Sequence, residues 1–401
     1  MLTAISLSLF VTIVGLVNVQ CASSEDPNVT YVELFRHGVT AYQKEQWISC
    51  INYFARAVDD YKFYKKATSS CRRKCHGESG NQTIVTNLED IENRFFETGI
   101  KHTLCLIKCR KATLQGRTTA YVPEIDEAME NLVPYDYLQL CYFKHGTPDR
   151  AATAAYTFLQ ANPGHETMQT NLKFYLSKEG KATQEDLKNT ESREYQELYK
   201  EGIAAYEKKN YQAVKDKMEQ GLEAYLGEEE NCRVMCEGSF DQDNMQPDLY
   251  IAVANHMTFA LKSRLRCAPR LQKFDASISS EGMVARFYLY LVRAYLELDQ
   301  VQEACHAVES YLLFVPKDLS MLDARKKLKN NNEAKDEWFT PRPEALRYYQ
   351  RERTEKNLLD FVEKEFAYLV EQHKEAKKPE QSKKDSKMGE MEKKTSKTQS
   401  A

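Results

Sequence analysis

The chain has 401 residues, of which 29% are charged, and its net charge is −3. This length allows two or more domains with a sizeable core, and the near balance of charge excludes a general attraction to nucleic acid or to an acidic membrane surface. Glycine (15 residues) and proline (11 residues) are scarce, so the composition favours an all-α fold over a many-stranded β fold.

The N-terminus has the pattern of a secretory signal peptide. An apolar stretch runs from Leu2 to Val19 and is followed by small residues before the first charge at Glu25. We expect a signal peptide over residues 1–22. The alternative is an uncleaved anchor, because no lysine or arginine precedes the apolar stretch. No other long apolar run occurs, so we expect no membrane span in the mature chain.

The next segment is repeated later in the chain. Residues 34–42 read LFRHGVTAY, and residues 198–206 read LYKEGIAAY. The same register continues through three further pairs of positions, Trp47 with Tyr211, Phe54 with Met218, and Ala57 with Gly221. A second pair of segments, residues 135–163 and 288–316, also aligns and ends on a proline in both copies. These matches predict two related halves, at 23–180 and 181–340, each with two helical units.

Each unit has the pattern of a tetratricopeptide-like helix pair. The first helix carries a glycine in the middle, as at Gly38 and Gly202, and the second carries an alanine near its start, as at Ala151 and Ala304. Small residues at these positions allow two helices to approach closely, and the neighbouring aromatic residues fill the remaining gaps. The sequence therefore predicts an all-α array of tetratricopeptide-like helical repeats.

Cysteines are the second strong signal. Cys21 falls at the signal peptide, and ten cysteines remain: Cys50, Cys71, Cys75, Cys105, Cys109, Cys141, Cys232, Cys236, Cys267 and Cys305. An even number behind a signal peptide indicates a disulfide framework. Six lie in the first half and four in the second, so all ten are disulfide candidates that could close within each half. The pairing stays open at this point.

The cysteine spacing adds one detail. The first half contains two C-x3-C pairs, and the second half contains one pair plus Cys267, with Ser263 at the position where its companion would stand. Residues four apart share one face of a helix, so such pairs are expected to join neighbouring helices. Two sequons, at Asn28 and Asn81, are candidates for N-glycosylation in the secretory pathway, to which the signal peptide directs a chain.

The C-terminal part has a different character. A last amphipathic helix is predicted over residues 341–373. Residues 374–401 are mostly lysine, glutamate, serine and threonine, and this composition predicts a disordered charged tail. The chain ends without a retrieval signal of the Lys-Asp-Glu-Leu type.

Motifs for catalysis are weak throughout. No C-x-x-C motif occurs, which disfavours disulfide exchange chemistry. His76 follows Cys75, but C-x3-C spacing behind a signal peptide favours bridges over zinc. The segment His76-Gly77-Glu78 has the H-x-E spelling of an iron oxygenase, and we interpret it as chance because no strand-rich segment follows. We therefore predict no catalytic residue, no cofactor and no metal ligand, and interpret the chain as a binding subunit.

Several segments in combination resemble the leprecan family, which includes cartilage-associated and SC65-type members without catalytic activity. These are the C-x3-C pairs within the duplicated array, YLQLCYFK at 137–144, TFL at 157–159 with Pro163, SYLLF at 310–314 and PRPEA at 341–345. The resemblance covers nearly the whole mature chain. In the catalytic leprecans this helical region precedes a 2-oxoglutarate dioxygenase domain that 3-hydroxylates prolines of procollagen, and this chain stops where that domain would begin.

The resemblance thus implies a non-enzymatic adaptor in the endoplasmic reticulum lumen. The implied partners are a prolyl 3-hydroxylase, a cyclophilin-type prolyl isomerase and procollagen chains. An alternative within the family is an SC65-type partner of lysyl hydroxylase. The alternatives outside this role are a binding protein secreted to the extracellular matrix and an enzyme, either a thiol oxidoreductase or an unrecognised oxygenase.

Overall fold

The computed structural model describes residues 29–78, 84–87, 89–114, 117, 122–239, 248–274, 282–330 and 333–365. Within these ranges the regular structure is helical and no strand forms, which confirms the predicted all-α fold. The sequons Asn28 and Asn81, the predicted signal peptide, the end of the predicted last helix and the predicted tail lie outside the described residues.

The described part of the first half is built of helices. They are α1 (Tyr31–Gln43), α2 (Trp47–Glu78), α3 (Ile91–Thr113), α4 (Pro123–Glu130), α5 (Val133–His145), α6 (Pro148–Ala161) and α7 (Glu166–Tyr175). A 3-10 turn, η1 (Gln184–Asp186), leads into the second half.

The second half has a similar order of helices. They are α8 (Glu194–Glu207), α9 (Tyr211–Met235), α10 (Leu249–Arg264), α11 (Cys267–Gln272), α12 (Met283–Glu297), α13 (Val301–Phe314) and α14 (Leu319–Lys329). A second 3-10 turn, η2 (Asp336–Trp338), precedes a helix over residues 343–365.

The duplication extends to the backbone conformation of the turns. Four turns within helix pairs each contain one residue with positive φ, namely Glu45 (55°), Gly146 (88°), Lys209 (55°) and Asp299 (56°). Glu45 and Lys209 occupy equivalent positions in the sequence alignment, as do Gly146 and Asp299. A left-handed residue after the last turn of a helix ends that helix and reverses the chain. The two halves therefore use the same turn geometry with different side chains.

The predicted close approach of paired helices is also present. A β-carbon added at Gly38 would lie 2.9 Å from the ring of Phe54, and one at Gly202 would lie 2.6 Å from Cε of Met218. The glycines thus leave room for a large side chain of the partner helix. The same contact between α1 and α2 recurs between α8 and α9, as expected for a tetratricopeptide-like repeat.

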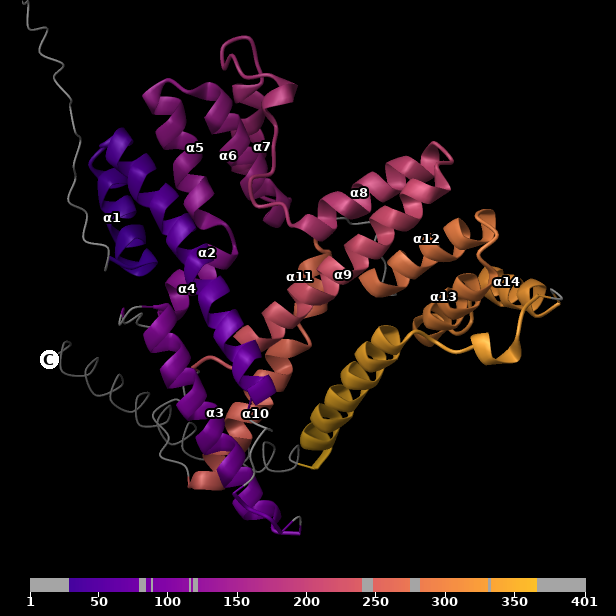
Figure 1. The fold of residues 1–401 in the computed structure, drawn as a ribbon. Helices are drawn as coiled ribbons and strands as arrows, with labels where there is room; N and C mark the ends of the chain where they lie inside the picture. The colour runs from indigo at the N-terminus through magenta and orange to yellow at the C-terminus, as the bar shows by residue number, and fades with distance from the viewer. Residues whose placement is uncertain are drawn as a thin grey trace, which may run out of the picture.

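Buried side chains form two separate cores. One cluster extends from Tyr31 to Ala182 and the other from Tyr195 to Ala345. In Figure 1 the two groups of helices diverge as two arms from the region where α2 meets α9. The change from one core to the other falls between Ala182 and Tyr195, and the domain bounds at 180 and 181 stay a prediction.

Candidate binding site at the junction of the two halves

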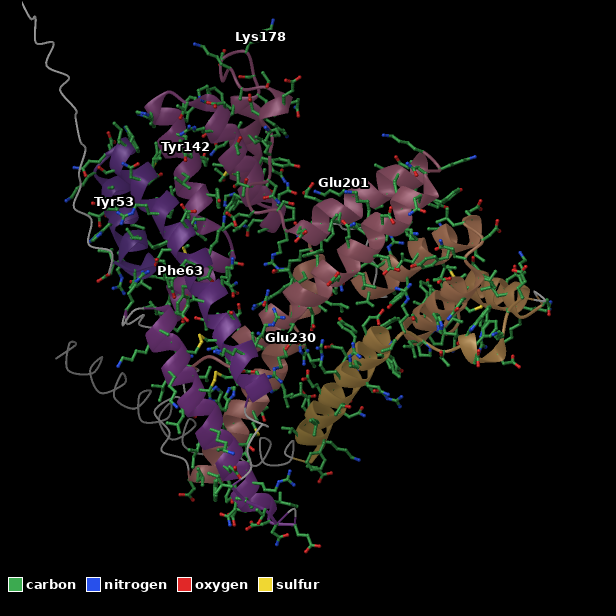
Figure 2. The ribbon with its side chains drawn as sticks, in the orientation of Figure 1. Tyr53, Phe63, Tyr142, Lys178, Glu201 and Glu230 are labelled. Atoms are coloured by element: carbon green, nitrogen blue, oxygen red, sulfur yellow. A yellow bond between two sulfur atoms is a disulfide. The ribbon has the colours of Figure 1, made fainter. Side chains whose placement is uncertain are left out.

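Two disulfides clamp α3 against α2. Cys71 is bonded to Cys109, and Cys75 is bonded to Cys105. Each helix supplies two cysteines four residues apart, and the pairing runs in opposite directions along the two helices. The sulfur atoms of the bridges lie between α2 and α3 in Figure 2. The C-x3-C pairs therefore act as staples between helices, and the α2–α3 hairpin is a covalently fixed unit.

A third bridge, Cys50–Cys141, joins α2 to α5 within the first half. The aligned positions of the second half are Val214 and Ala294, both fully buried. The second half thus fills the same space with apolar side chains.

Two of the ten disulfide candidates, both in the second half, are not bonded, so the expected closure of all four cysteines there is corrected. Cys232 is bonded to Cys267, whereas Cys236 and Cys305 are free thiols. The Cys232–Cys267 bridge corresponds to Cys71–Cys109, so the counterpart of Cys105 is Ser263, which leaves Cys236 without a partner.

Cys305 is unpaired for a different reason. It is fully buried within α13, in the core of the second half, at the position that Ala152 occupies in the first half. There it fills space as a small apolar side chain, which is the usual role of a buried free cysteine. The even number of cysteines in the second half therefore gave the wrong count of bridges.

A buried arginine joins the two halves. Arg72 of α2 donates from Nη1 to the carbonyl oxygens of Val234 at 2.7 Å and Met235 at 3.0 Å. These carbonyls belong to the last turn of α9, which carries the negative end of the helix dipole, and they also accept long backbone hydrogen bonds from Glu237 at 3.4 Å and Gly238 at 3.3 Å. Burial lowers the pKa of Arg72 from its ordinary value. The contact adds a charged donor, and a positive charge, to carbonyl groups at the negative end of α9.

An ionic cluster fastens the helix over residues 343–365 to the same region. Arg233 of α9 pairs with Glu229, Glu352 and Glu355, and Arg351 pairs with Glu229. Burial raises the pKa of Glu229, and the charges of the two guanidinium groups oppose that shift. Such a cluster requires each charge to keep its partners, since an unpaired buried charge is costly.

The tip formed by α3 and α10 carries an unusual amount of exposed apolar surface. Neither helix contributes a fully buried residue. On α3, Ile100, Leu104 and Ile107 are 60%, 50% and 58% exposed and share one helix face. On α10 the exposed apolar side chains are Leu249, Tyr250, Ile251, Met257 and Phe259. We call these eight residues the tip surface. Exposed apolar side chains that gather into a patch mark binding sites, so these residues are candidates for contact with a partner.

The two helices of the tip are connected to each other. Tyr250 of α10 donates a hydrogen bond to Glu92 at the start of α3. Because α3 belongs to the first half and α10 to the second, the tip surface is assembled from both halves.

Three titratable side chains converge beside the α2–α3 hairpin. His76 Nε2 lies 2.8 Å from Glu237 Oε1, and the rings of His76 and His102 have centroids 4.7 Å apart. The sequence did not connect these residues. His76 follows Cys75 and His102 precedes Cys105, so the Cys75–Cys105 bridge, once known, brings the two histidines together.

No helix in the described ranges is long and apolar enough to cross a membrane.

The repeat region has a family match. A model described as the leprecan family TPR-like repeat region matches residues 30–331. The chain belongs to the leprecan family. The matched region contains the first core, the second core apart from Ala345, the four disulfides and the tip surface.

Three similar proteins illustrate the range of this family. Mouse cartilage-associated protein is 27% identical over 335 residues, which cover 82% of both chains. Human endoplasmic reticulum protein SC65 is 27% identical over 82% of this chain and 76% of SC65. Human prolyl 3-hydroxylase 1 is also 27% identical over 82% of this chain, but the match covers 46% of that protein. The leprecan chain thus aligns with about half the length of prolyl 3-hydroxylase 1.

Proposed function

We propose that this leprecan chain is a non-enzymatic adaptor subunit of a procollagen-modifying complex in the endoplasmic reticulum lumen. It supports prolyl 3-hydroxylation and collagen folding together with a prolyl 3-hydroxylase and a cyclophilin-type prolyl isomerase. The observation that carries this proposal is the match, over 82% of the chain, to both cartilage-associated protein and prolyl 3-hydroxylase 1.

The chemistry of the cysteines supports an adaptor over a thiol oxidoreductase. Eight cysteines are held in four bridges. Burial raises the pKa of the Cys236 thiol and that of the Cys305 thiol above the ordinary value. A reactive cysteine needs a lowered pKa, because the thiolate is the nucleophile. Neither free thiol therefore has the environment of a redox catalyst.

The tip surface supports a binding role. Its side chains come from two helices, of which α3 is fixed to α2 by two disulfides and α10 contacts α9 and donates a hydrogen bond from Tyr250 to α3. A preorganised apolar surface binds a partner at a smaller entropic cost than a flexible one. We propose that the prolyl 3-hydroxylase covers the tip surface.

Purified proteins test this directly. The full chain, with its disulfides formed, is mixed with prolyl 3-hydroxylase 1, and the mass of the complex is measured by light scattering after size exclusion. We expect a stable complex for the wild-type chain and a loss of at least tenfold in affinity for Leu104→Glu. The control Ile48→Glu changes an equally apolar residue, 61% exposed, on a distant part of α2, and should bind normally. Failure of the wild-type chain to bind would contradict the proposal.

The second candidate is a partner of lysyl hydroxylase. SC65 matches this chain at the same 27% identity as cartilage-associated protein, over 76% rather than 82% of the relative, and this similarity supports the second candidate. The same binding assay with a lysyl hydroxylase in place of the prolyl 3-hydroxylase separates the two. Secretion to the matrix is the third alternative, and localisation of the untagged chain in producing cells separates it from retention in the lumen.

A further inference from the structure

The side chains of His76, His102 and Glu237 form a compact set of metal-ligand types. Their nearest ligand atoms, one per residue, all lie within 4.8 Å of one another. They come from three elements: α2 supplies His76, α3 supplies His102, and Glu237 follows the end of α9. The set therefore spans the junction between the two halves.

The two histidines are held in place by a covalent link. Cys75 and Cys105 are bonded, with their Cα atoms 5.6 Å apart. His76 is the next residue after Cys75, and His102 lies one helical turn before Cys105. Because the bridge fixes how α2 and α3 lie against each other, the two imidazole rings lie with their centroids 4.7 Å apart, tilted by 42°, before any ligand arrives. A preorganised pair binds a metal with less loss of side-chain entropy.

The three ligand atoms lie within a range that side-chain rotation can bring to a zinc ion. Zinc binds imidazole nitrogen and carboxylate oxygen at about 2.0–2.2 Å with tetrahedral geometry, which places neighbouring ligand atoms about 3.3 Å apart. The separation of 2.8 Å between His76 Nε2 and Glu237 Oε1 lies near that value, and small rotations of these partly exposed side chains would adjust it. Two histidines and one glutamate leave the fourth position for water or for a group from a partner.

One cation already contacts this set. Arg264 of α10 lies with Nη2 2.6 Å from Glu237 Oε1. Arg264 also has Glu355 as a partner, at 3.4 Å, so it keeps a carboxylate when Glu237 turns an oxygen towards a metal. Zinc would take the place of the hydrogen between His76 and Glu237. A histidine binds a metal as neutral imidazole through a ring nitrogen that carries no hydrogen, and a glutamate binds it as the ionised carboxylate.

We propose that His76, His102 and Glu237 bind one zinc ion, which ties the α2–α3 hairpin of the first half to the end of α9 in the second. This site is independent of the proposed function in collagen modification. Its physical effect is to add a bond across the junction where Arg72 already holds α9, and so to fix the angle between the two arms of the scaffold.

The test uses the full chain with its disulfides formed, stripped of metal with a chelator. Zinc is titrated by calorimetry, and amide hydrogen exchange is followed with and without zinc. We expect one zinc ion per chain, and slower exchange at the end of α9 and in the last turn of α2. In His102→Ala the affinity should fall at least tenfold and the zinc-dependent protection should disappear. His145→Ala, which changes an exposed histidine at the end of α5, is the matched control and should behave as wild type.

The outcomes separate a built site from casual binding. Absence of stoichiometric zinc binding by the wild-type chain would overturn the proposal. If zinc affinity falls equally in His102→Ala and His145→Ala, or falls in neither, the binding is adventitious binding at surface histidines. That result would also overturn the proposal. Far-ultraviolet circular dichroism of each variant shows whether the helices are retained, and Glu237→Gln provides a second variant should His102→Ala fold poorly.

Discussion

The sulfur atom of Cys236 lies 3.8 Å from that of Cys267, although Cys267 is bonded to Cys232. Cys232 and Cys236 are one helical turn apart on the same face of α9 and its end, so both are presented to Cys267. The first half shows the complete arrangement, in which each of two cysteines on α2 has its own partner on α3.

A cysteine restored at position 263 should complete the second clamp. In Ser263→Cys we expect Cys236 to bond to the new thiol, leaving Cys305 as the remaining free thiol among the described residues. A bridge of this kind stabilises by about 1–3 kcal/mol, with a modest gain here because Cys232–Cys267 already closes the loop. Alkylation of the denatured, unreduced protein followed by peptide mapping checks the pairing. A Cys236–Cys267 bond in the wild-type map would contradict it.

The two equivalent glycines should respond differently to alanine. In Gly38→Ala the new methyl group meets the rigid ring of Phe54 at 2.9 Å, so overpacking should exceed the gain in helix propensity and the free energy of unfolding should fall by about 1–2 kcal/mol. In Gly202→Ala the neighbour is the flexible end of Met218, which can move aside. For Gly202→Ala we expect the free energy of unfolding to change by less than about 1 kcal/mol. Urea denaturation compares the two, and a larger loss for Gly202→Ala would be inconsistent with this packing.

The positive φ of Lys209 predicts that glycine stabilises this turn. A side chain in the left-handed region costs about 1–2 kcal/mol, and glycine avoids most of that cost while losing more freedom on folding. Lys209→Gly should therefore raise the free energy of unfolding by about 0.5–1 kcal/mol. The neighbouring Lys208 has φ of −83°, so Lys208→Gly should lower it by a similar amount. Equal effects at the two positions, measured by thermal unfolding, would show that the turn geometry is different.

Loss of Arg72 should loosen the junction of the two halves. In Arg72→Met two carbonyl groups at the end of α9 lose their charged donor and keep only the long backbone hydrogen bonds from Glu237 and Gly238, and a hydrogen bond to a charged group contributes about 1.5–3 kcal/mol. We expect a loss of about 2–4 kcal/mol in the free energy of unfolding. Arg73→Met, one residue away and exposed with a hydrogen bond to Asn231, should change stability by less than about 0.5 kcal/mol. Similar losses for both variants would mean that Arg72 does not hold α9.

The repeats could be predicted from sequence because their signals are local. Gly38 and Gly202 mark where helices approach, and the same spacing to Phe54 and Met218 repeats along the chain, so the all-α array and its duplication were both visible. The stapling role of the C-x3-C pairs followed from helical periodicity. Counting cysteines failed for Cys305. From sequence alone, a cysteine that packs in a core as a free thiol looks the same as one that forms a disulfide, because its neighbours in space are unknown.

The junction could not be predicted for a related reason. Arg72 contacts backbone atoms of α9, and any residue type offers a carbonyl group, so no sequence motif marks the contact. His76, His102 and Glu237 are far apart in sequence, and their meeting depends on the bridge between α2 and α3 together with the angle between the two halves. The tip surface likewise became visible only when α3 and α10 were seen to bury none of their side chains completely.

The most direct test of the proposed role is the occupancy of 3-hydroxyproline in procollagen, measured by mass spectrometry of collagen from cells that lack this chain. The account predicts that the occupancy falls strongly, that the wild-type chain and Ile48→Glu restore it, and that Leu104→Glu restores it poorly. Unchanged 3-hydroxyproline in cells without the chain would contradict the account.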